Sequence, residues 1–373
     1  MVPTVQSNIL YMHRVRWPLF AKYDIPHKYG LAPYSTVNLN ISTSDNVRLG
    51  AWFIVSDSYY QHTSKVKGRR PNRPLSLPEL TTAMSRYPTV LFFHGNAADR
   101  AVAYRVSLYS QLSNRLGANV LVIDYRGFGN SDGTPTEAGL AKDAKAAWDW
   151  LVTYGASPSS ILIMGHSLGA SVATMLASEL SSRGIRPRGV TLVAPFTDTQ
   201  TIARTYTLGG VIPLFRPLSV FPYVLEMVVS LIAEMHDTKS RINSIQAPIL
   251  LVHCRKDPTI PSAHSRDLFE TLLDPLLPPL PPTPEGFARS KLPREHSKHL
   301  NEAIARRNQS RAGTVTESTI GGFASHVAEF DRGERGRGGK VKLVETLYGG
   351  HTNIVGASGV IDLIGEFFDI WRT

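Results

Sequence analysis

Five short, continuous runs of apolar residues recur along the chain and constrain its fold more than any other feature. The runs read VLFF, VLVI, ILIM, VTLV and ILLV, and segments with helical apolar spacing lie between them. Such runs are typical of strands that are buried on both faces of a parallel sheet. Their alternation with helices predicts an α/β fold with a mainly parallel sheet flanked by helices.

The same patterns give the bounds of the expected elements. We predict strands at 36–41, 50–55, 89–94, 120–124, 161–165, 189–193, 249–254 and 340–346. We predict helices at 101–116, 137–154, 169–183, 262–273 and 354–371. In sheets of this kind the active site collects at the carboxyl ends of the strands, so we look for chemistry in the loops that follow them.

Two basic segments interrupt the alternation. The formal net charge of the 373 residues is +10, and much of the excess lies in residues 61–86 and in a proline-rich insertion at 274–340. Both segments have too little apolar surface to offset chain entropy, so we interpret them as loops or disorder. We therefore expect deletion of 275–338 to leave folding largely unchanged. No nucleic-acid-binding motif accompanies these charges, so nucleic acid is not an expected partner.

Cofactor and metal signatures are absent from the sequence. A single cysteine excludes an internal disulfide framework. The chain has no cluster of histidines at metal-ligand spacing and no G-x-G-x-x-G after its first strand. We expect neither a metal nor an organic cofactor.

The run ILIM leads into Gly165-His166-Ser167-Leu168-Gly169, which a helical pattern follows. This G-x-S-x-G motif between a strand and a helix is typical of a nucleophile elbow, in which a serine hydroxyl projects above the sheet. Gly165 and Gly169 flank the serine with the small residues that so sharp a turn needs. We predict that Ser167 is a catalytic nucleophile.

A serine hydroxyl needs a base, and two later strand ends provide partners. Asp257 follows the strand at 249–254, and His351 lies in a glycine-rich loop after the strand at 340–346. We predict that His351 is the general base and that Asp257 orients it. The alternatives are His166 as the base, and Asp198 or Asp267 as the acid. Five other histidines are interpreted as a buried strand residue (His253), part of another motif (His94) and parts of the predicted disorder (His296, His299 and His326).

The tetrahedral intermediate of acyl transfer needs an oxyanion hole made of N–H donors. We predict the backbone N–H of Leu168 as one donor and that of Asn96 as the other, with Ala97 as the alternative to Asn96. Asn96 lies in the loop HGNAAD, which follows the strand at 89–94. The glycine-rich loop at 124–133 is interpreted as a scaffold of the pocket wall.

The region at 199–240 is predicted to be a cap over the site. Its apolar stretch at 205–235 is broken by prolines into pieces shorter than a membrane span. We expect it to line an acyl-chain pocket and to touch a membrane peripherally, with Leu214 and Phe221 at the contact. Residues 1–35 are predicted to be an N-terminal extension, and they resemble neither a signal peptide nor a membrane span.

The segments HGNAADR, DYRGFGNSDGTPTEAGLAKDA, GHSLGASVAT and APFTD resemble the α/β-hydrolase superfamily. Within it they are most similar to the acylglycerol and lysophosphatidylserine lipases. The resemblance covers most of the chain from residue 36 onward, apart from 274–340. It implies an α/β-hydrolase fold, the triad Ser167, Asp257 and His351, and an intracellular place at the endoplasmic reticulum or another membrane, or otherwise in the cytoplasm. The N-terminal membrane helix usual in those lipases is not found in this sequence.

The expected activity is therefore hydrolysis of carboxylic esters of long-chain lipids, namely a monoacylglycerol or a lysophospholipid. Two alternatives stay open. One is cleavage of the thioester of palmitoylated proteins, which needs the same triad. The other is a non-catalytic scaffold that binds partners through the insertion at 274–340.

Overall fold

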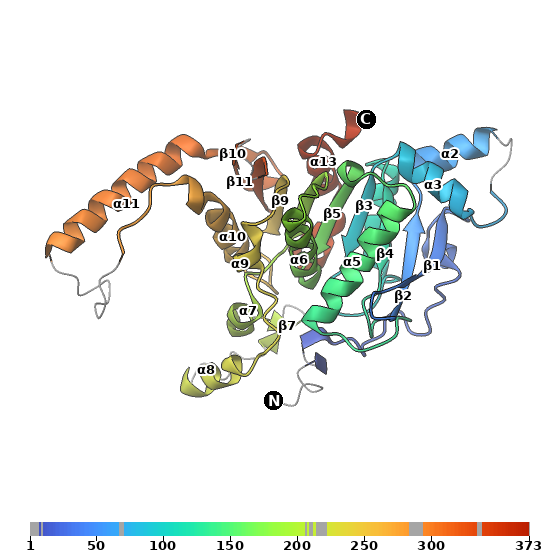
Figure 1. The fold of residues 1–373 in the computed structure, drawn as a ribbon, viewed down its shortest axis with the longest axis horizontal. Helices are drawn as coiled ribbons and strands as arrows, with labels where there is room; N and C mark the ends of the chain where they lie inside the picture. The colour runs from blue at the N-terminus through green and yellow to red at the C-terminus, as the bar shows by residue number, and fades with distance from the viewer. Residues whose placement is uncertain are drawn as a thin grey trace.

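The computed structural model describes residues 7–8, 10–66, 71–205, 207–208, 212–213, 222–282, 294–333 and 338–372. In these residues a ten-stranded sheet has the order β1-β2-β4-β3-β5-β6-β9-β12-β11-β10 (Figure 1). The six strands from β4 to β12 in this order run parallel, and the strands at both edges are antiparallel. The strands are β1 (Thr36–Ser42), β2 (Arg48–Ile54), β3 (Thr89–Phe93), β4 (Asn119–Ile123), β5 (Ile161–His166), β6 (Gly189–Val193), β9 (Ile249–Cys254), β10 (Thr316–Ile320), β11 (Ala324–Asp331) and β12 (Lys340–Thr346).

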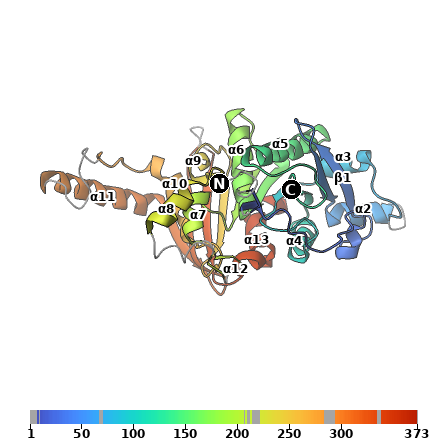
Figure 2. The ribbon, with the colours of Figure 1, turned by 90° about the horizontal axis from the view of Figure 1, so that it is seen from below.

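Helices cover both faces of the sheet, which explains why the central strands are mostly apolar. Figure 2 shows α5 and α6 on one side of the sheet, and α4 and α13 on the other. Every residue of β3, β4, β5, β6 and β9 is buried. The principal helices are α4 (Ala103–Asn114), α5 (Glu137–Thr153), α6 (Leu168–Ser182), α10 (Ala263–Leu273) and α13 (Ser358–Phe367).

The predicted cap region contains α7 (Thr199–Thr205), the short strands β7 (Thr207–Leu208) and β8 (Ile212–Pro213), α8 (Pro222–Ser230) and α9 (Thr238–Ile242). The rest of its apolar stretch, including Leu214 and Phe221, lies outside the described residues. None of the described helices is long and apolar enough to cross a bilayer.

The prediction of disorder across 274–340 is wrong for residues 294–331, which form α11 (Arg294–Thr314), β10 and β11. β11 pairs with β12 and buries Phe330, whose ring meets Phe269 of α10 edge-on, with 5.0 Å between the ring centroids. The charged composition of the whole insertion concealed β11, ASHVAEFD, in which apolar residues are buried among polar ones. Residues 283–293 and 334–337 of the predicted disorder lie outside the described residues.

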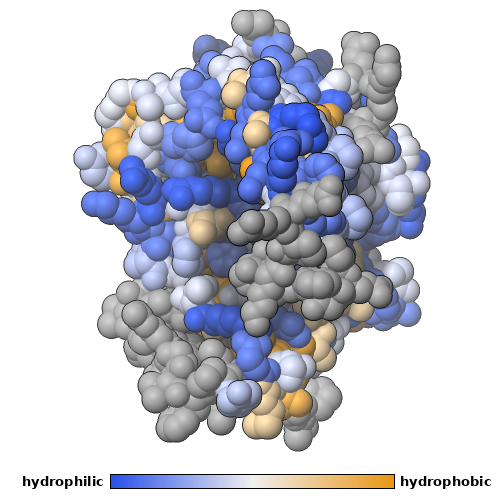
Figure 3. All heavy atoms as spheres, turned by 90° about the vertical axis from the view of Figure 1, so that its left-hand side faces the viewer, coloured by the Kyte–Doolittle hydropathy of each residue, from blue (hydrophilic) through white to orange (hydrophobic). Residues whose placement is uncertain are grey.

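The helix α11 stands away from the body of the molecule (Figures 1 and 2). The side from which it projects is mostly hydrophilic (Figure 3). Arg307 and Arg311 of α11 form ion pairs with Asp274 and Glu270 at its base. Its polar sequence therefore reflects a solvated helix, which composition alone did not separate from disorder.

The prediction of loop or disorder at 61–86 is also wrong in part. Residues 57–66 form α2 (Asp57–Val66), and residues 77–86 form α3 (Leu77–Arg86). A capping box begins α3, because the Ser76 N–H donates to the Glu79 carboxylate at 2.8 Å. The apolar face of α3, with Leu80 and Met84, is buried.

Candidate active site

Ser167 lies between the carboxyl end of β5 and the first turn of α6. Its φ of 55° is in the left-handed region, which is uncommon for residues other than glycine and often occurs at functional sites. The Ser167 N–H donates to the Val193 carbonyl at 2.9 Å, which fixes the turn to the end of β6. An added Cβ would overlap the backbone of Gly169 at position 165, and that of Phe93 at position 169. The backbones approach so closely here that only glycine fits.

Asp257 and His351, separated by 94 positions in the sequence, meet at the ends of β9 and β12. His351 Nδ1 donates to Asp257 Oδ2 at 2.7 Å. The other oxygen, Oδ1, accepts the N–H groups of Thr259 at 2.8 Å and Ile260 at 3.0 Å. Because Nδ1 donates to the carboxylate, Nε2 of the neutral imidazole is left unprotonated and available as a base.

The environment keeps the Asp257 carboxylate charged. Its burial alone would raise its pKa, but hydrogen bonds from His253 and His351 outweigh burial and hold the pKa below its ordinary value. His253 Nε2 lies 3.4 Å from Asp257 Oδ2, and its Nδ1 is 2.7 Å from the Ser265 hydroxyl oxygen. His253, which sequence reasoning treated as an ordinary core histidine, thus packs against the acid.

His166 connects the loop of His351 to the elbow. Its Nε2 donates to the His351 carbonyl oxygen at 2.9 Å, and the two ring centroids are 5.0 Å apart. Burial, with a contribution from His351, lowers the pKa of His166 to about 3, so its ring is neutral near pH 7. His166, the residue before Ser167, therefore holds the loop of His351 beside the elbow. This contact does not favour His166 as the base.

The loop after β3 packs directly on the elbow. An added Cβ on Gly95 would lie 3.0 Å from both the His166 carbonyl oxygen and Ser167 Cβ. Asn96, in the same loop, donates its side-chain amide to the Leu10 carbonyl at 2.5 Å. The predicted N-terminal extension thus contacts this loop beside Ser167.

Sequence reasoning missed Arg105, a fully buried residue of α4 that holds this loop. Its guanidinium donates to the carbonyl oxygens of Gly95 at 2.6 Å, Ala97 at 2.7 Å and Asp99 at 2.7 Å. A signal was present, because Arg105 shares a helix face with Leu108, Tyr109 and Leu112 at the i+3, i+4 and i+7 positions. A cation on a buried helix face needs internal acceptors, which are here the loop carbonyls.

The loop at 124–133, interpreted from the sequence as scaffold, packs behind the 94–97 loop. The buried Asp124 accepts the backbone N–H of Arg100 at 2.7 Å and forms an ion pair with its guanidinium. The Tyr125 hydroxyl donates to the His94 carbonyl at 2.8 Å. These bonds join the ends of β3 and β4 below the candidate site.

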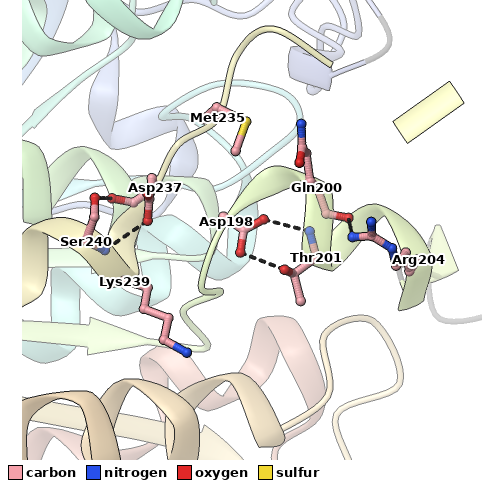
Figure 4. A pocket seen from close by; sticks show the side chains of 8 residues that line it. All are labelled: Asp198, Gln200, Thr201, Arg204, Met235, Asp237, Lys239 and Ser240. Carbon is pink, nitrogen blue, oxygen red and sulfur yellow. Dashed lines mark hydrogen bonds between the residues drawn. The ribbon is translucent and has the colours of Figure 1, made fainter. Parts of the chain in front are cut away.

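The alternative acids are engaged elsewhere. Asp198 accepts the backbone N–H and the hydroxyl of Thr201, each at 2.7 Å, at the start of α7. It lines a polar cavity of about 450 Å³ together with Arg204, Met235 and Lys239 (Figure 4). Asp267 pairs with Lys239 on the surface, at 2.8 Å. Asp257, in contrast, is hydrogen-bonded to His351.

The described residues contain no group of three or more His, Cys, Asp or Glu side chains positioned to hold a metal ion. Cys254, at the end of β9, is buried and free.

Comparison with known proteins identifies the family of this chain. A model of the alpha/beta hydrolase family matches residues 90–291, more than half of the chain. The chain belongs to this family. An alpha-beta hydrolase from Vibrio vulnificus has the same fold, with a TM-score of 0.55, 17% identity and coverage of 100% of this chain and 94% of the other.

Curated relatives of this α/β hydrolase include the lysophosphatidylserine lipases ABHD12 of Danio rerio and Xenopus tropicalis. The first is 28% identical over 268 residues and the second 31% identical over 268 residues. Each match covers 72% of this chain, and it covers 66% and 65% of the respective relative. The chain therefore spans slightly less than two thirds of the length of these relatives.

Proposed function

We propose that this α/β hydrolase cleaves carboxylic esters of long-chain lipids, a monoacylglycerol or a lysophospholipid, through an acyl-serine intermediate. The observation that carries the proposal is the 2.7 Å hydrogen bond from His351 to Asp257, in a loop that His166 joins to the elbow of Ser167. The names of the relatives, lysophosphatidylserine lipases, support a lipid ester as the substrate.

In this proposal the Ser167 hydroxyl attacks the ester carbonyl carbon while His351 Nε2 accepts its proton. The tetrahedral intermediate collapses to acyl-Ser167, and the imidazolium returns the proton to the departing alcohol oxygen. Water then attacks the acyl-serine with His351 as base again, which releases the fatty acid and restores the serine. The ionised Asp257 balances the imidazolium charge at both steps.

The oxyanion would be bound by the backbone N–H groups of Leu168 and Asn96. Leu168 is the first residue of α6, where the helix dipole favours negative charge. The other donor lies in the loop that Arg105 fixes through three carbonyl oxygens. Held in this way, the loop needs no rearrangement when charge develops on the substrate oxygen.

Release of fatty acid or thiol from three substrates tests the proposal. Purified wild type and Ser167→Ala would be given 1-monooleoylglycerol, lysophosphatidylserine and a palmitoyl-thioester peptide. We expect a lipid ester to be turned over fastest, and Ser167→Ala to be slower by about 10³-fold or more.

Ser178→Ala is the matched control, because Ser178 lies on α6 with its hydroxyl bonded to Ser244. It should retain wild-type turnover. Equal activity of Ser167→Ala and wild type would show that Ser167 is not the nucleophile. Faster turnover of the thioester peptide than of either lipid ester would favour a protein depalmitoylase over a lipid esterase.

A further inference from the structure

A loop at residues 14–20 exposes large apolar side chains next to one another. The exposed fractions are 59% for Trp17, 65% for Leu19 and 90% for Phe20, and Val15 is also exposed. Single exposed apolar residues are ordinary on protein surfaces, whereas a contiguous group marks an interaction site. We call these residues the 14–20 loop.

The 14–20 loop is also cationic. Arg14 and Arg16 are exposed, and neither forms an ion pair with any residue that the structure describes. The first 23 residues of the chain include no aspartate or glutamate. Arginine beside tryptophan and phenylalanine suits the headgroup region of a membrane, where aromatic rings insert and cations meet lipid phosphates.

Buried residues hold the loop at both ends. Before it, the fully buried Tyr11 bonds through its hydroxyl to Glu234 at 3.0 Å and to His236 at 2.8 Å. After it, the Tyr23 carbonyl accepts the indole N–H of Trp52 at 2.8 Å. Anchored ends reduce the chain entropy that binding would otherwise cost.

The same anchor connects the loop to the candidate site. Leu10, next to Tyr11, accepts the bond from Asn96 in the 94–97 loop beside Ser167. His236, which bonds to Tyr11, lies in the segment between α8 and α9 and its ring is 3.2 Å from the hydroxyl of Ser171 on α6. The residues just before the 14–20 loop are thus bonded to the 94–97 loop beside Ser167 and, through His236, to α6.

We propose that the 14–20 loop docks the protein on an anionic lipid surface, with Trp17, Leu19 and Phe20 in the headgroup layer and Arg14 and Arg16 on lipid phosphates. The positive charge of the loop, beside its apolar side chains, favours this partner, because an anionic bilayer offers both a negative surface and an apolar layer below it. The consequence for catalysis rests on the proposed function: docking brings the site to a bilayer that holds its substrate.

Co-sedimentation with vesicles tests the docking without the chemistry. The Ser167→Ala protein would be mixed with vesicles of phosphatidylcholine alone or of phosphatidylcholine with phosphatidylserine. We expect stronger binding to the anionic vesicles, weakening as salt rises. Trp17→Ser with Phe20→Ser should lower the bound fraction about tenfold or more, and Arg14→Gln with Arg16→Gln should remove the preference for anionic vesicles.

Leu77→Ser with Ile320→Ser is the matched control, because it removes two exposed apolar side chains from α3 and β10. It should bind as the parent does. Unchanged binding by the Trp17 and Phe20 variant, at an unchanged melting temperature, would overturn the proposal. The proposal would also be overturned if the parent bound both kinds of vesicle equally or bound neither. The partner of the loop would then be a protein.

The two proposals fail in different ways. With Ser167 intact, the Trp17 and Phe20 variant should hydrolyse a short soluble ester at the wild-type rate and a vesicle-borne lipid ester more slowly. If the variant and wild type hydrolyse the vesicle-borne ester at the same rate, docking is contradicted and the proposed esterase is not. Absence of all ester hydrolysis in a protein that still binds vesicles contradicts the esterase and leaves docking standing.

Discussion

The Asp257 carboxylate uses both of its oxygens at once. One oxygen is occupied by two backbone N–H groups, which fixes its plane, and the other accepts from His351. A carboxylate that accepts several hydrogen bonds is stabilised in its charged form even when it is buried. The position of His351 therefore depends on the charge at Asp257.

Asp257→Asn should lower ester turnover by about 10⁴-fold, because an amide neither balances the imidazolium nor fixes the Nδ1-protonated form of His351. The rate of hydrolysis of a soluble ester measures this. Asp267→Asn, which removes a surface carboxylate paired with Lys239, is the control and should keep wild-type turnover. Similar rates for the two variants would contradict the role of Asp257.

The depressed pKa of Asp257 also predicts how stability depends on pH. A carboxyl group whose pKa is lower in the folded state stabilises the fold above its unfolded pKa, which is about 4, and this contribution is lost as pH falls through the folded value. The difference in melting temperature between wild type and Asp257→Asn should therefore shrink as pH falls from about 5 to about 3. A difference that stays constant or grows over this range would show that Asp257 is not held charged.

Gly169→Ala should destabilise the fold by about 1–3 kcal/mol, because the new Cβ meets the end of β3. Chemical denaturation measures this change in unfolding free energy. Gly313→Ala is the matched control, since an added Cβ on this residue of α11 has open space around it. A Gly169→Ala protein as stable as the control would contradict the close packing at the elbow.

The inserted segment between β9 and β12 adds strands to the sheet. β11 extends it beyond β12, and its buried Phe330 joins the core under α10. Arg332, just after β11, donates to the carbonyl oxygens of Ile245 at 2.9 Å and Ala247 at 2.6 Å. Deletion of 275–338 removes these contacts, so we now expect it to lower the melting temperature substantially.

Phe330→Ala should lower the unfolding free energy by about 3–5 kcal/mol, because it leaves a cavity against Phe269. Ile320→Ala on the exposed strand β10 should change it by about 0.5 kcal/mol or less. Denaturant unfolding of the two variants compares them directly. Equal and small losses would show that β11 is not part of the folded core.

The sequence predicted the structure well where a single property, such as burial on both faces, determines an element. Apolar runs predicted the parallel strands, because strands that are buried on both faces are mostly apolar. Composition averaged over long segments failed at β11 and α3, where a short apolar pattern lies among charged residues. The contact of Asn96 with Leu10 spans 86 positions, and no local pattern encodes such a pairing.

The molecule gathers its candidate chemistry at one end of the sheet. The carboxyl ends of β3, β5, β9 and β12 carry the 94–97 loop, Ser167, Asp257 and His351, respectively. The sequence predicted these four positions from their place after strands, and the structure shows the 94–97 loop packed on Ser167 and His351 bonded to Asp257. The helix pattern marks Arg105 as a buried cation, but its acceptors in that loop, and the contact of the loop with the N-terminal segment, emerge only from the folded chain.

The most direct test of the central claim is labelling with a fluorophosphonate probe, followed by mass mapping of the modified residue. We predict one adduct, on Ser167, in wild type and in Ser178→Ala. Ser167→Ala should give none, and His351→Ala should react slower by about 10²-fold or more, because the hydroxyl loses its base. An adduct on another residue, or undiminished labelling of folded Ser167→Ala, would show that Ser167 is not the nucleophile.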